Sequence, residues 1–576
     1  MWLKRFAVWT GSFLLAVVIL AVAAGLSFRV ALGPPAQEIA RDAVYAPRGV
    51  VATSQPLASQ AGLRVLEQGG NAVDAAVTAA AVLGVVEPYM TGLGGDMFAI
   101  LWSEEEQRLI GINGSGRSGS LMTLDALPNG VPDYGPTTIT VPGALSGWAA
   151  LLEEHGTISL AEALAPAIAL AEEGFPVSRT SAAEWALFES DLKRNAAATA
   201  AFLIDGERAP GTGEWYANPD MARTMRALAE SGPELLYGGS LGLQIAEHVQ
   251  SLGGFVTAED FAAHEAEWIE PMSVPFGDYR LWELPPNGQG IAALEMLRLL
   301  EGTDLAALGH NSPRYLHRLI EAKKLAFADL EHFVGDPEFM EVEAGELLSD
   351  TFIAQRRSRI QPGKAATHVD PERSLTQSDT TYLAAADRHG NMISFINSLA
   401  GAFGSGIVVP GTGFALQNRG VGLSEDLDKA NTIGPGRRPF HTIIPGFVTK
   451  TGGDGAQEPW LAFGIVGGAQ QPPAHVQVLL NMLVFEMDVQ QALDAPRFRH
   501  WRGRSVSLES AIPESTVDKL SAMGHRTDDP LMEVGRTLML GRHQGFIFGC
   551  GQAVQRLDRG YVAGSDSRRD GIAAAH

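Results

Sequence analysis

The chain has 576 residues, of which 45% are hydrophobic and 19% are charged, so it is long enough for one large core or several domains. Its formal net charge of −23 repels nucleic-acid phosphates, which excludes nucleic acid as the expected partner. The single cysteine, Cys550, excludes an intramolecular disulfide, a cysteine zinc cluster and a CxxC redox pair.

The first feature along the chain is an uncharged apolar stretch at residues 7–28, which follows a basic flank at residues 1–6. Its length suits a transmembrane helix, and the positive flank favours a cytoplasmic N-terminus. We interpret residues 7–28 as an uncleaved signal anchor. A cleaved signal peptide is the alternative, because residues 21–23 are small. Both interpretations place the rest of the chain outside the cytoplasm, in the periplasm or at the cell surface, anchored or secreted, after a tether at residues 29–44.

The next segments alternate between predicted helices and short apolar strands. Hydrophobic periodicity predicts an amphipathic helix over residues 57–68 and an almost fully buried helix over residues 72–86, with Gly69-Gly70-Asn71 as the turn between them. An apolar run predicts a buried strand at residues 97–102. Alanine-rich segments with charged faces predict mainly helices over residues 151–330.

The second half of the chain changes from helical to strand-like patterns. Residues 356–379 contain five Arg or Lys and no apolar periodicity, which predicts an exposed linker. Strands are predicted at residues 381–386, 391–397 and 413–417, where apolar runs are separated by turns that contain glycine. A helix is predicted at residues 473–485.

Three motifs resemble known sites but lack the required surroundings. Gly114–Gly119 satisfies GxGxxG, yet a turn-rich segment follows it instead of a helix, so we do not predict dinucleotide binding. Gly238–Gly242 matches GxSxG without a preceding apolar strand, and we interpret it as a helix N-cap. His310 and His317 lie seven residues apart on a possible helix face, but no HExxH pattern or carboxylate partner accompanies them in the sequence, so we interpret them as packing or surface histidines and predict no metal site.

The junction between the polar linker and the next strand carries the most informative pattern. A hydroxyl residue at the head of a strand suits self-cleavage, in which the Thr380 hydroxyl attacks the carbonyl of Asp379 and the resulting ester hydrolyses. Thr380 then becomes a new N-terminus, whose α-amine, with a pKa of about 8, serves as the base. The spacing alone leaves open the alternative of an ordinary threonine at a strand edge.

A series of motifs runs in one order from about residue 45 to the C-terminus. They are Gln55-Pro56-Leu57-Ala58-Ser59, Gly69-Gly70-Asn71-Ala72-Val73-Asp74-Ala75-Ala76, Gly92-Leu93-Gly94-Gly95, Val141-Pro142-Gly143, Pro285-Pro286-Asn287-Gly288-Gln289-Gly290, Asp379-Thr380-Thr381, Phe403-Gly404-Ser405-Gly406, Gly467-Gly468 and Gly564-Ser565-Asp566-Ser567-Arg568-Arg569-Asp570-Gly571. This set resembles the γ-glutamyltranspeptidase family. The resemblance implies an α+β fold, the αββα sandwich of N-terminal-nucleophile hydrolases. It also implies a cut between Asp379 and Thr380, which would leave chains 45–379 and 380–576 associated with each other.

The same resemblance implies roles for four catalytic residues. Thr380 is expected to attack the amide carbonyl and to carry the acyl group. The backbone N–H groups of Gly467 and Gly468 match the pair that stabilises the oxyanion in the family. Ser398 falls at the position of a hydroxyl that supports the nucleophile.

The substrate-binding positions depart from the family pattern. In typical members an arginine binds the glutamyl α-carboxylate. In this chain the corresponding position lies near Ser115 and holds no arginine, and Arg117 is the nearest one. The acidic residue that binds the α-amine falls near Val421, close to Arg419. The serine pair that contacts the carboxylate corresponds to His441-Thr442. We therefore expect Ser115, Arg117, Arg419 and His441-Thr442 to line the substrate site.

Three functions remain open on these grounds. The first is a self-processing threonine hydrolase or acyltransferase that cleaves γ-glutamyl, glutathione-like amides, with hydrolysis favoured because the lid segment between Ser424 and Arg438 is short. The second is an acylase or amidohydrolase of the same family, like a cephalosporin acylase, that acts on another anionic amide. The third is an unprocessed, inactive scaffold anchored to the membrane. The expected partners are a small-molecule amide, the sister chain of the precursor and the membrane, and no cofactor or metal is expected.

Overall fold

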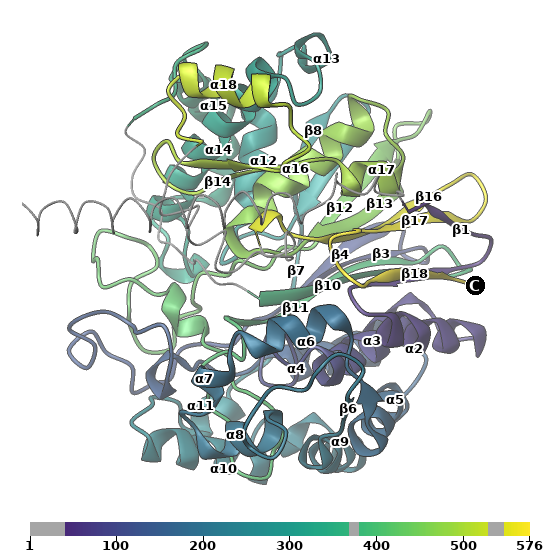
Figure 1. Ribbon diagram of the computed structural model, residues 1–576, viewed down its shortest axis with the longest axis vertical. Helices are drawn as coiled ribbons and strands as arrows, with labels where there is room; N and C mark the ends of the chain where they lie inside the picture. Colours follow the sequence, from purple (N-terminus) through teal and green to yellow (C-terminus); the bar gives the residue numbers. More distant parts are fainter. Residues whose placement is uncertain (1–40, 368–378, 528–546) are drawn as a thin grey trace, which may run out of the picture. The chain divides into compact units, whose positions relative to one another are not determined.

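The computed structural model describes residues 41–367, 379–527 and 547–576 (Figure 1). The predicted anchor at residues 7–28 and the linker residues 368–378 lie outside the described residues. No helix within the described ranges is long and apolar enough to cross a membrane.

Two seven-stranded antiparallel sheets lie face to face at the centre of the fold (Figure 1). The first sheet has the order β18 (Ile572–Ala575), β2 (Val50–Thr53), β10 (Asp379–Ala386), β11 (Met392–Ala400), β3 (Asp96–Ser103), β4 (Arg108–Gly114) and β7 (Glu267–Ile269). The second sheet has the order β1 (Val44–Ala46), β17 (Tyr561–Ser565), β16 (Gly551–Arg556), β13 (Gln457–Ile465), β12 (Gly446–Thr451), β9 (Tyr279–Glu283) and β8 (Met272–Phe276). Two short hairpins are separate, β5 (Phe175–Pro176) with β6 (Trp215–Tyr216) and β14 (Phe498–His500) with β15 (Val506–Leu508).

Side chains alternate along the strands between two different apolar cores. In β10, Tyr382 and Ala384 pack in the core between the sheets, whereas Leu383 and Ala385 pack against helices. This alternation is the period-2 pattern of a strand, and here both faces are buried. Each sheet is therefore covered on its outer face by a helical layer, which gives the four layers αββα.

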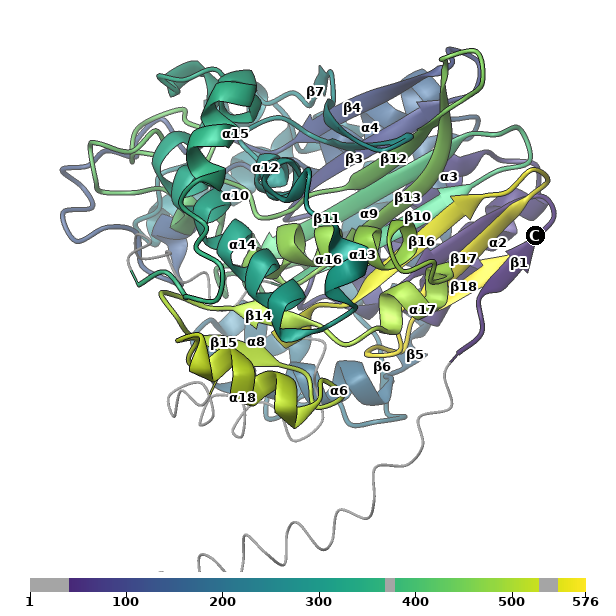
Figure 2. The ribbon, with the colours of Figure 1, turned by 90° about the horizontal axis from the view of Figure 1, so that it is seen from above.

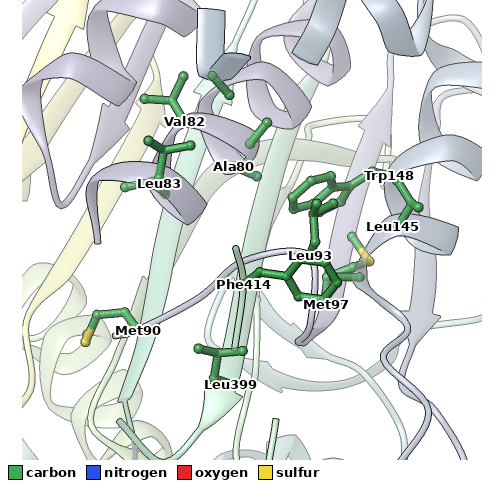
Figure 3. Packing of buried hydrophobic residues seen from close by; sticks show 14 of the residues in the cluster. Ala80, Val82, Leu83, Met90, Leu93, Met97, Leu145, Trp148, Leu399 and Phe414 are labelled. Carbon is green, nitrogen blue, oxygen red and sulfur yellow. The ribbon is translucent and has the colours of Figure 1, made fainter. Parts of the chain in front are cut away.

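The first helical layer covers the first sheet and is built around α3 (Ala72–Val86). All 15 residues of α3 are buried, and its N-terminus is fixed by a capping box between Asn71 and Asp74. Figure 3 shows Ala80, Val82 and Leu83 in this core, near Trp148 and Leu399. The other helices of this layer are α2 (Pro56–Glu67), α4 (Ala144–His155), α5 (Leu160–Glu173), α6 (Arg179–Ala186), α7 (Glu189–Leu192), α8 (Ala196–Phe202), α9 (Pro219–Ser231), α10 (Ser240–Ser251) and α11 (Ala258–Ala262).

The second helical layer covers the second sheet, as Figure 2 shows from above. Its longest member is α14 (Pro313–Phe333), which begins with Ser312 as N-cap and Pro313 in its first turn. The others are α12 (Gly290–Leu300), α13 (Leu305–Leu308), α15 (Asp350–Arg357), α16 (Gln471–Leu483), α17 (Val489–Asp494) and α18 (Glu514–Ala522). Short 3-10 turns lie between these elements at η1 (Pro136–Thr138), η2 (Pro233–Leu235), η3 (Pro337–Phe339), η4 (Ala344–Leu348), η5 (Arg419–Gly422) and η6 (Gly468–Gln470).

The structure confirms most of the predicted elements and corrects others. The helices expected at residues 57–68, 72–86 and 473–485 correspond to α2, α3 and α16, and the strands at 97–102, 381–386 and 391–397 correspond to β3, β10 and β11. Residues 413–417 do not form a strand, because apart from the single bridge between Val408 and Ala415 this segment makes no ladder. The region 151–330 is mainly helical, as expected, and it also contributes the short strands β5 to β9.

Three smaller expectations are also corrected. The described part of the predicted exposed linker is partly buried, with Ile360 7% and Ala365 4% exposed, because α14 and residues near α18 pack against it. Helix α10 does begin at the GxSxG motif, but its N-cap is Gly239 and the Ser240 side chain makes no cap bond. His310 lies before α14 and so does not share a helix with His317.

Candidate active site

Three polar side chains form a row across three neighbouring strands of the first sheet. Thr380 of β10 lies opposite Ser398 of β11, and Ser398 lies opposite Asp96 of β3. Directly opposed residues share one face of a sheet. Two residues along each strand, Tyr382, Ile396 and Phe98 belong to the core between the sheets. This row, here called the Thr380 row, therefore faces the second sheet and is almost fully buried, with Thr380 1% and Asp96 0% exposed.

The Thr380 hydroxyl is held by its neighbour in the row. It donates a hydrogen bond to Ser398 Oγ at 3.1 Å. Ser398 Oγ in turn accepts from the Ala400 N–H at 2.9 Å and from Arg419 Nη2 at 3.1 Å. A register shift between Asp379 and Thr380 interrupts the regular ladder at the head of β10. The Thr380 hydroxyl, which sequence analysis proposed as the nucleophile, is thus held in one direction by a buried network that includes the guanidinium of Arg419.

Arg419, the first residue of η5, is the cation of this network. Its Nη1 donates to Thr442 Oγ1 at 3.2 Å, and its Nε lies 4.0 Å from Asp96 Oδ2. Burial lowers the pKa of Arg419 to about 10, although the Asp96 charge opposes the shift. The guanidinium therefore stays charged at neutral pH, and Asp96 supplies the opposite charge that a buried cation needs.

Asp96 also organises the backbone around it. Its Oδ1 accepts hydrogen bonds from the N–H groups of Gly116 at 3.2 Å and Gly143 at 3.1 Å. Its Oδ2 lies 3.1 Å from His441 Nε2. Burial, followed by the charge of Arg419, lowers the pKa of His441 to about 4. His441 is therefore neutral at pH 7, and the site carries one buried cation opposite one carboxylate.

The two expected oxyanion donors lie where β13 of the second sheet ends. Gly464, near that end, packs against the Tyr382 ring of β10. Gly467 and Gly468 follow with φ values of 123° and 60°, which glycine adopts readily. Their N–H groups precede α16 in the turn η6, and they donate to no acceptor within the described ranges. Backbone N–H groups at such a turn can bind an anion.

A buried glutamine links this glycine turn to the Thr380 row. Gln289 Nε2 donates to Gly468 O at 2.8 Å and to Thr442 O at 2.5 Å. Thr442 Oγ1 accepts from Arg419, which reaches Ser398 and so Thr380. One continuous hydrogen-bond network thus connects the nucleophile candidate with the turn that carries the oxyanion donors.

A cavity opens beside the same Gln289 and Thr442. We call it the Val421 cavity, and its lining is mainly apolar. It is lined by Gln289, Phe327, Leu330, Glu331, Val334, Val421, Gly422, Ser424, Lys429, Asn431, Phe440, Thr442 and Ala469. Lys429 is the lysine of this lining, and its ammonium forms no ion pair with any residue that the structure describes.

Arg117, which was expected at the substrate site, and two further arginines, Arg437 and Arg438, differ in their surroundings. Arg117 is bound by Asp336 at 3.0 Å and Glu338 at 2.6 Å, so its guanidinium already has carboxylate partners. Arg438 is likewise paired with Glu267. Arg437 stacks on the Phe339 ring, with its Cζ 4.0 Å from the ring centroid.

Ser115, another predicted substrate contact, lies in a buried amide cluster. Its hydroxyl donates to Asn113 Oδ1 at 2.7 Å and accepts from Asn287 Nδ2 at 3.2 Å. Asn287 also donates to Pro439 O at 2.8 Å, which fixes the chain just before His441. The cluster therefore supports the wall of the site.

Sequence analysis missed three residues of the site. Asp96 follows Gly94-Gly95 at the head of an apolar strand, and a carboxylate in that place is a usable signal because burial of a charge requires a partner. Gln289 lies in the recognised motif at residues 285–290, but sequence analysis assigned no role to this side chain. Lys429 offers no pattern in the sequence, since only the folded chain brings it to the Val421 cavity.

The chain is similar to known proteins over most of its length. A sequence profile described as Gamma-glutamyltranspeptidase matches residues 58–576. The chain is 36% identical to the glutathione hydrolase-like YwrD proenzyme of Bacillus subtilis (strain 168), over 92% of this chain and 99% of that protein. It is 33% identical to the acylase ACY 1 proenzyme of Pseudomonas sp. (strain SE83), over 83% of this chain and 87% of that protein. Among solved structures, the cephalosporin acylase from Bacillus halodurans matches with a TM-score of 0.85 and 40% identity, over 95% of this chain and 99% of that chain.

Proposed function

Since the chain belongs to the γ-glutamyltranspeptidase family, whose enzymes act on amide bonds, we propose that it is a precursor that cleaves itself before Thr380 and then hydrolyses an amide through an acyl-enzyme. The products of cleavage would be the chains 45–379 and 380–576. The observation that carries the proposal is the Thr380 hydroxyl, buried and held by Ser398 within reach of the Arg419 network. The proenzyme names of its relatives support a processed precursor.

The proposed cleavage and the proposed turnover use the same hydroxyl. In the precursor, Thr380 Oγ1 attacks the carbonyl carbon of Asp379, and the C–N bond to Thr380 breaks to give an ester that water hydrolyses. In turnover, the freed α-amine of Thr380 accepts the hydroxyl proton while Oγ1 attacks the substrate carbonyl. The amine of the substrate leaves with a proton, and water then releases the acyl group from Oγ1.

The oxyanion of each tetrahedral intermediate needs donors that are already in place. We assign this role to the N–H groups of Gly467 and Gly468, since neither donates to another acceptor in the described part of the chain. Ser398 holds the nucleophile, and Arg419 is a positioning residue that acts through Ser398 and Thr442. Arg419 was expected to contact the substrate, but its Nη1 and Nη2 donate instead to Thr442 and Ser398.

The acyl group is proposed to occupy the Val421 cavity. γ-Glutamyl amides are the first candidate substrates, since the glutathione hydrolase-like YwrD proenzyme is a relative. Val421 lies in the wall of this cavity, however, where the family has an acidic residue, and Glu331, the carboxylate of this lining, already has another partner. Lys429 supplies a positive charge that suits a terminal carboxylate. The cavity therefore favours the second candidate class, an anionic acyl group without an α-ammonium, such as a glutaryl amide.

Two further features of the function stay proposals. We propose water as the main acceptor, because the segment between Ser424 and Arg438 is short and leaves the acyl-enzyme open to solvent. We also propose an extracytoplasmic location, anchored through residues 7–28 or secreted, on the basis of the apolar sequence there.

Self-cleavage is tested by the intact mass of the purified protein with N-terminal sequencing. The wild type should give two chains, the smaller beginning at Thr380, and Thr380→Ala should give one chain. Thr381→Val is the matched control, because the neighbouring hydroxyl bonds only the backbone oxygen of Asn397 and should not be needed. An uncut wild type, or cleavage in Thr380→Ala, would contradict the proposal and favour the inactive scaffold.

The substrate class is tested with the processed enzyme on matched anilides. Glutaryl and γ-glutamyl p-nitroanilide differ only in the α-ammonium group, so the ratio of their kcat/KM values isolates its effect. We expect the glutaryl compound to be the better substrate. A ratio in favour of the γ-glutamyl compound would restore the first candidate.

A further inference from the structure

A second buried cluster lies in the other helical layer. His317 and Glu321 are four residues apart on α14, so they share one face of the helix, and His525 follows α18. His317 Nδ1 lies 2.9 Å from His525 Nε2, and His525 Nε2 lies 4.0 Å from Glu321 Oε1. The three ligand atoms all lie within 4.8 Å of one another, and all three residues are buried. We call these residues the His317 cluster.

We propose that the His317 cluster binds a divalent transition-metal ion, for which zinc is the probe. A tetrahedral zinc ion with bonds of about 2.0–2.1 Å holds its ligand atoms about 3.3 Å apart. The separations in the cluster, from 2.9 to 4.8 Å, lie on both sides of that value, so small side-chain rotations suffice. Two imidazoles and one carboxylate are a ligand set that zinc accepts. This inference replaces our sequence-based prediction that His317 has no carboxylate partner.

The surroundings of the cluster orient these ligand atoms. His317 Nε2 lies 2.9 Å from the carbonyl oxygen of Gln361, so donation to that oxygen directs the Nδ1 lone pair into the cluster. Glu321 Oε2 accepts from the Ala366 N–H at 3.1 Å, and Oε1 is the oxygen that faces His525. Outer contacts of this kind are typical of metal ligands.

His525 faces His317 through its Nε2. Since His317 donates through its own Nε2, the 2.9 Å contact without an ion is a hydrogen bond from His525 Nε2–H to His317 Nδ1. An ion that binds both nitrogens would replace this bond and leave the proton of His525 on Nδ1, which is buried and has no hydrogen-bond partner among the described residues.

Lys324 competes with an ion for the same carboxylate. Its Nζ donates to Glu321 Oε1 at 2.7 Å and to Ala366 O at 3.2 Å. An ion that binds Oε1 would displace this ammonium, so removal of the Lys324 charge should strengthen metal binding.

The metal would connect two parts of the precursor. His317 and Glu321 precede the proposed cut at Thr380, and His525 follows it. If the chain is cut there, as the proposed function requires, the ion would hold the two products together. The binding of the ion itself does not depend on that cut.

The test uses the full chain, which is loaded with zinc and then freed of excess metal. Zinc per chain is measured by elemental analysis, with the thermal midpoint before and after EDTA as a second readout. Glu321→Gln and His525→Ala remove ligands, and Lys324→Met removes the competing charge. His310→Ala is the matched control, because this half-buried histidine bonds Asn481 and lies outside the cluster.

We expect one zinc ion per chain in the wild type and in His310→Ala, and a loss of at least tenfold in affinity in both ligand variants. Lys324→Met should bind zinc more tightly than the wild type. Thr380→Ala should bind zinc like the wild type, which separates this proposal from self-cleavage. No zinc in the wild type, or unchanged binding in Glu321→Gln, would overturn the proposal. Weaker binding in Lys324→Met would also contradict it.

Discussion

The Thr380 row and the Val421 cavity meet at Gln289 and Thr442 but differ in how their polar groups are arranged. In the row, hydroxyl, guanidinium and carboxylate are buried and bound to one another. In the cavity, apolar walls surround a lysine without an ion-pair partner among the described residues. In the proposed function, the groups for bond cleavage are therefore already fixed by contacts within the protein, whereas Lys429 has its charge available for the acyl group.

The largest expected effect comes from the turn that completes the row. Gly467→Ala adds a Cβ at a φ of 123°, 3.2 Å from Gly549 Cα, so the turn must shift and its N–H groups lose their alignment. We expect kcat to fall by about 10²–10³, the usual cost of losing one oxyanion donor. Gly453→Ala is the control, since its Cβ meets nothing within 4 Å. An unchanged kcat in Gly467→Ala would show that the N–H groups of this turn do not stabilise the oxyanion.

The next prediction concerns removal of the buried cation, Arg419, and its effect on the free energy of unfolding. Arg419→Met leaves Asp96 without its compensating charge, which costs about 3–5 kcal/mol of unfolding free energy. Asp96→Asn added to Arg419→Met should recover part of that loss, because the uncompensated charge is then gone. Denaturant unfolding of the single and double variants measures both. If the double variant is less stable than Arg419→Met, the two groups do not form a compensating pair.

Substitutions in the Val421 cavity should change the preference between acyl groups and leave self-cleavage intact. Lys429→Met removes the cation, so kcat/KM for glutaryl anilide should fall about tenfold with little change for a neutral acyl anilide. Val421→Asp should shift preference toward the γ-glutamyl compound, because a carboxylate then faces the α-ammonium. Self-cleavage should proceed in both variants. Loss of self-cleavage would mean that the row and the cavity are not separable.

The smallest predicted effect is a pH dependence of stability at His441. Its folded pKa of about 4 lies below the unfolded value of about 6.5, so the unfolded state binds more protons between these values. The unfolding free energy should therefore fall as the pH drops through this range, by about 2 kcal/mol from pH 7 to pH 5 for this group. His441→Gln should show a correspondingly smaller fall, measured by urea titration. His389→Gln, at an exposed turn, should behave like the wild type.

Local patterns determined much of the fold in advance. The all-round apolar helix α3, the strands β3, β10 and β11, and the hydroxyl at the head of β10 could be read directly, because burial on both faces leaves long runs without charge. The four-layer fold and the roles of Thr380, Gly467 and Gly468 were implied by resemblance, since no periodicity reveals them.

Only the tertiary structure decided which polar residues meet. β-Sheet register brings Ser398 opposite Asp96, and the turn η5 brings Arg419 to both of them. Arg117 was expected at the substrate, but the fold provides it with Asp336 and Glu338 instead. His317 gains His525 in the same way, whereas Glu321 lies one helical turn away on α14. The physical reason is that sequence patterns report burial and local geometry, whereas charge pairing depends on long-range contacts that no short segment contains.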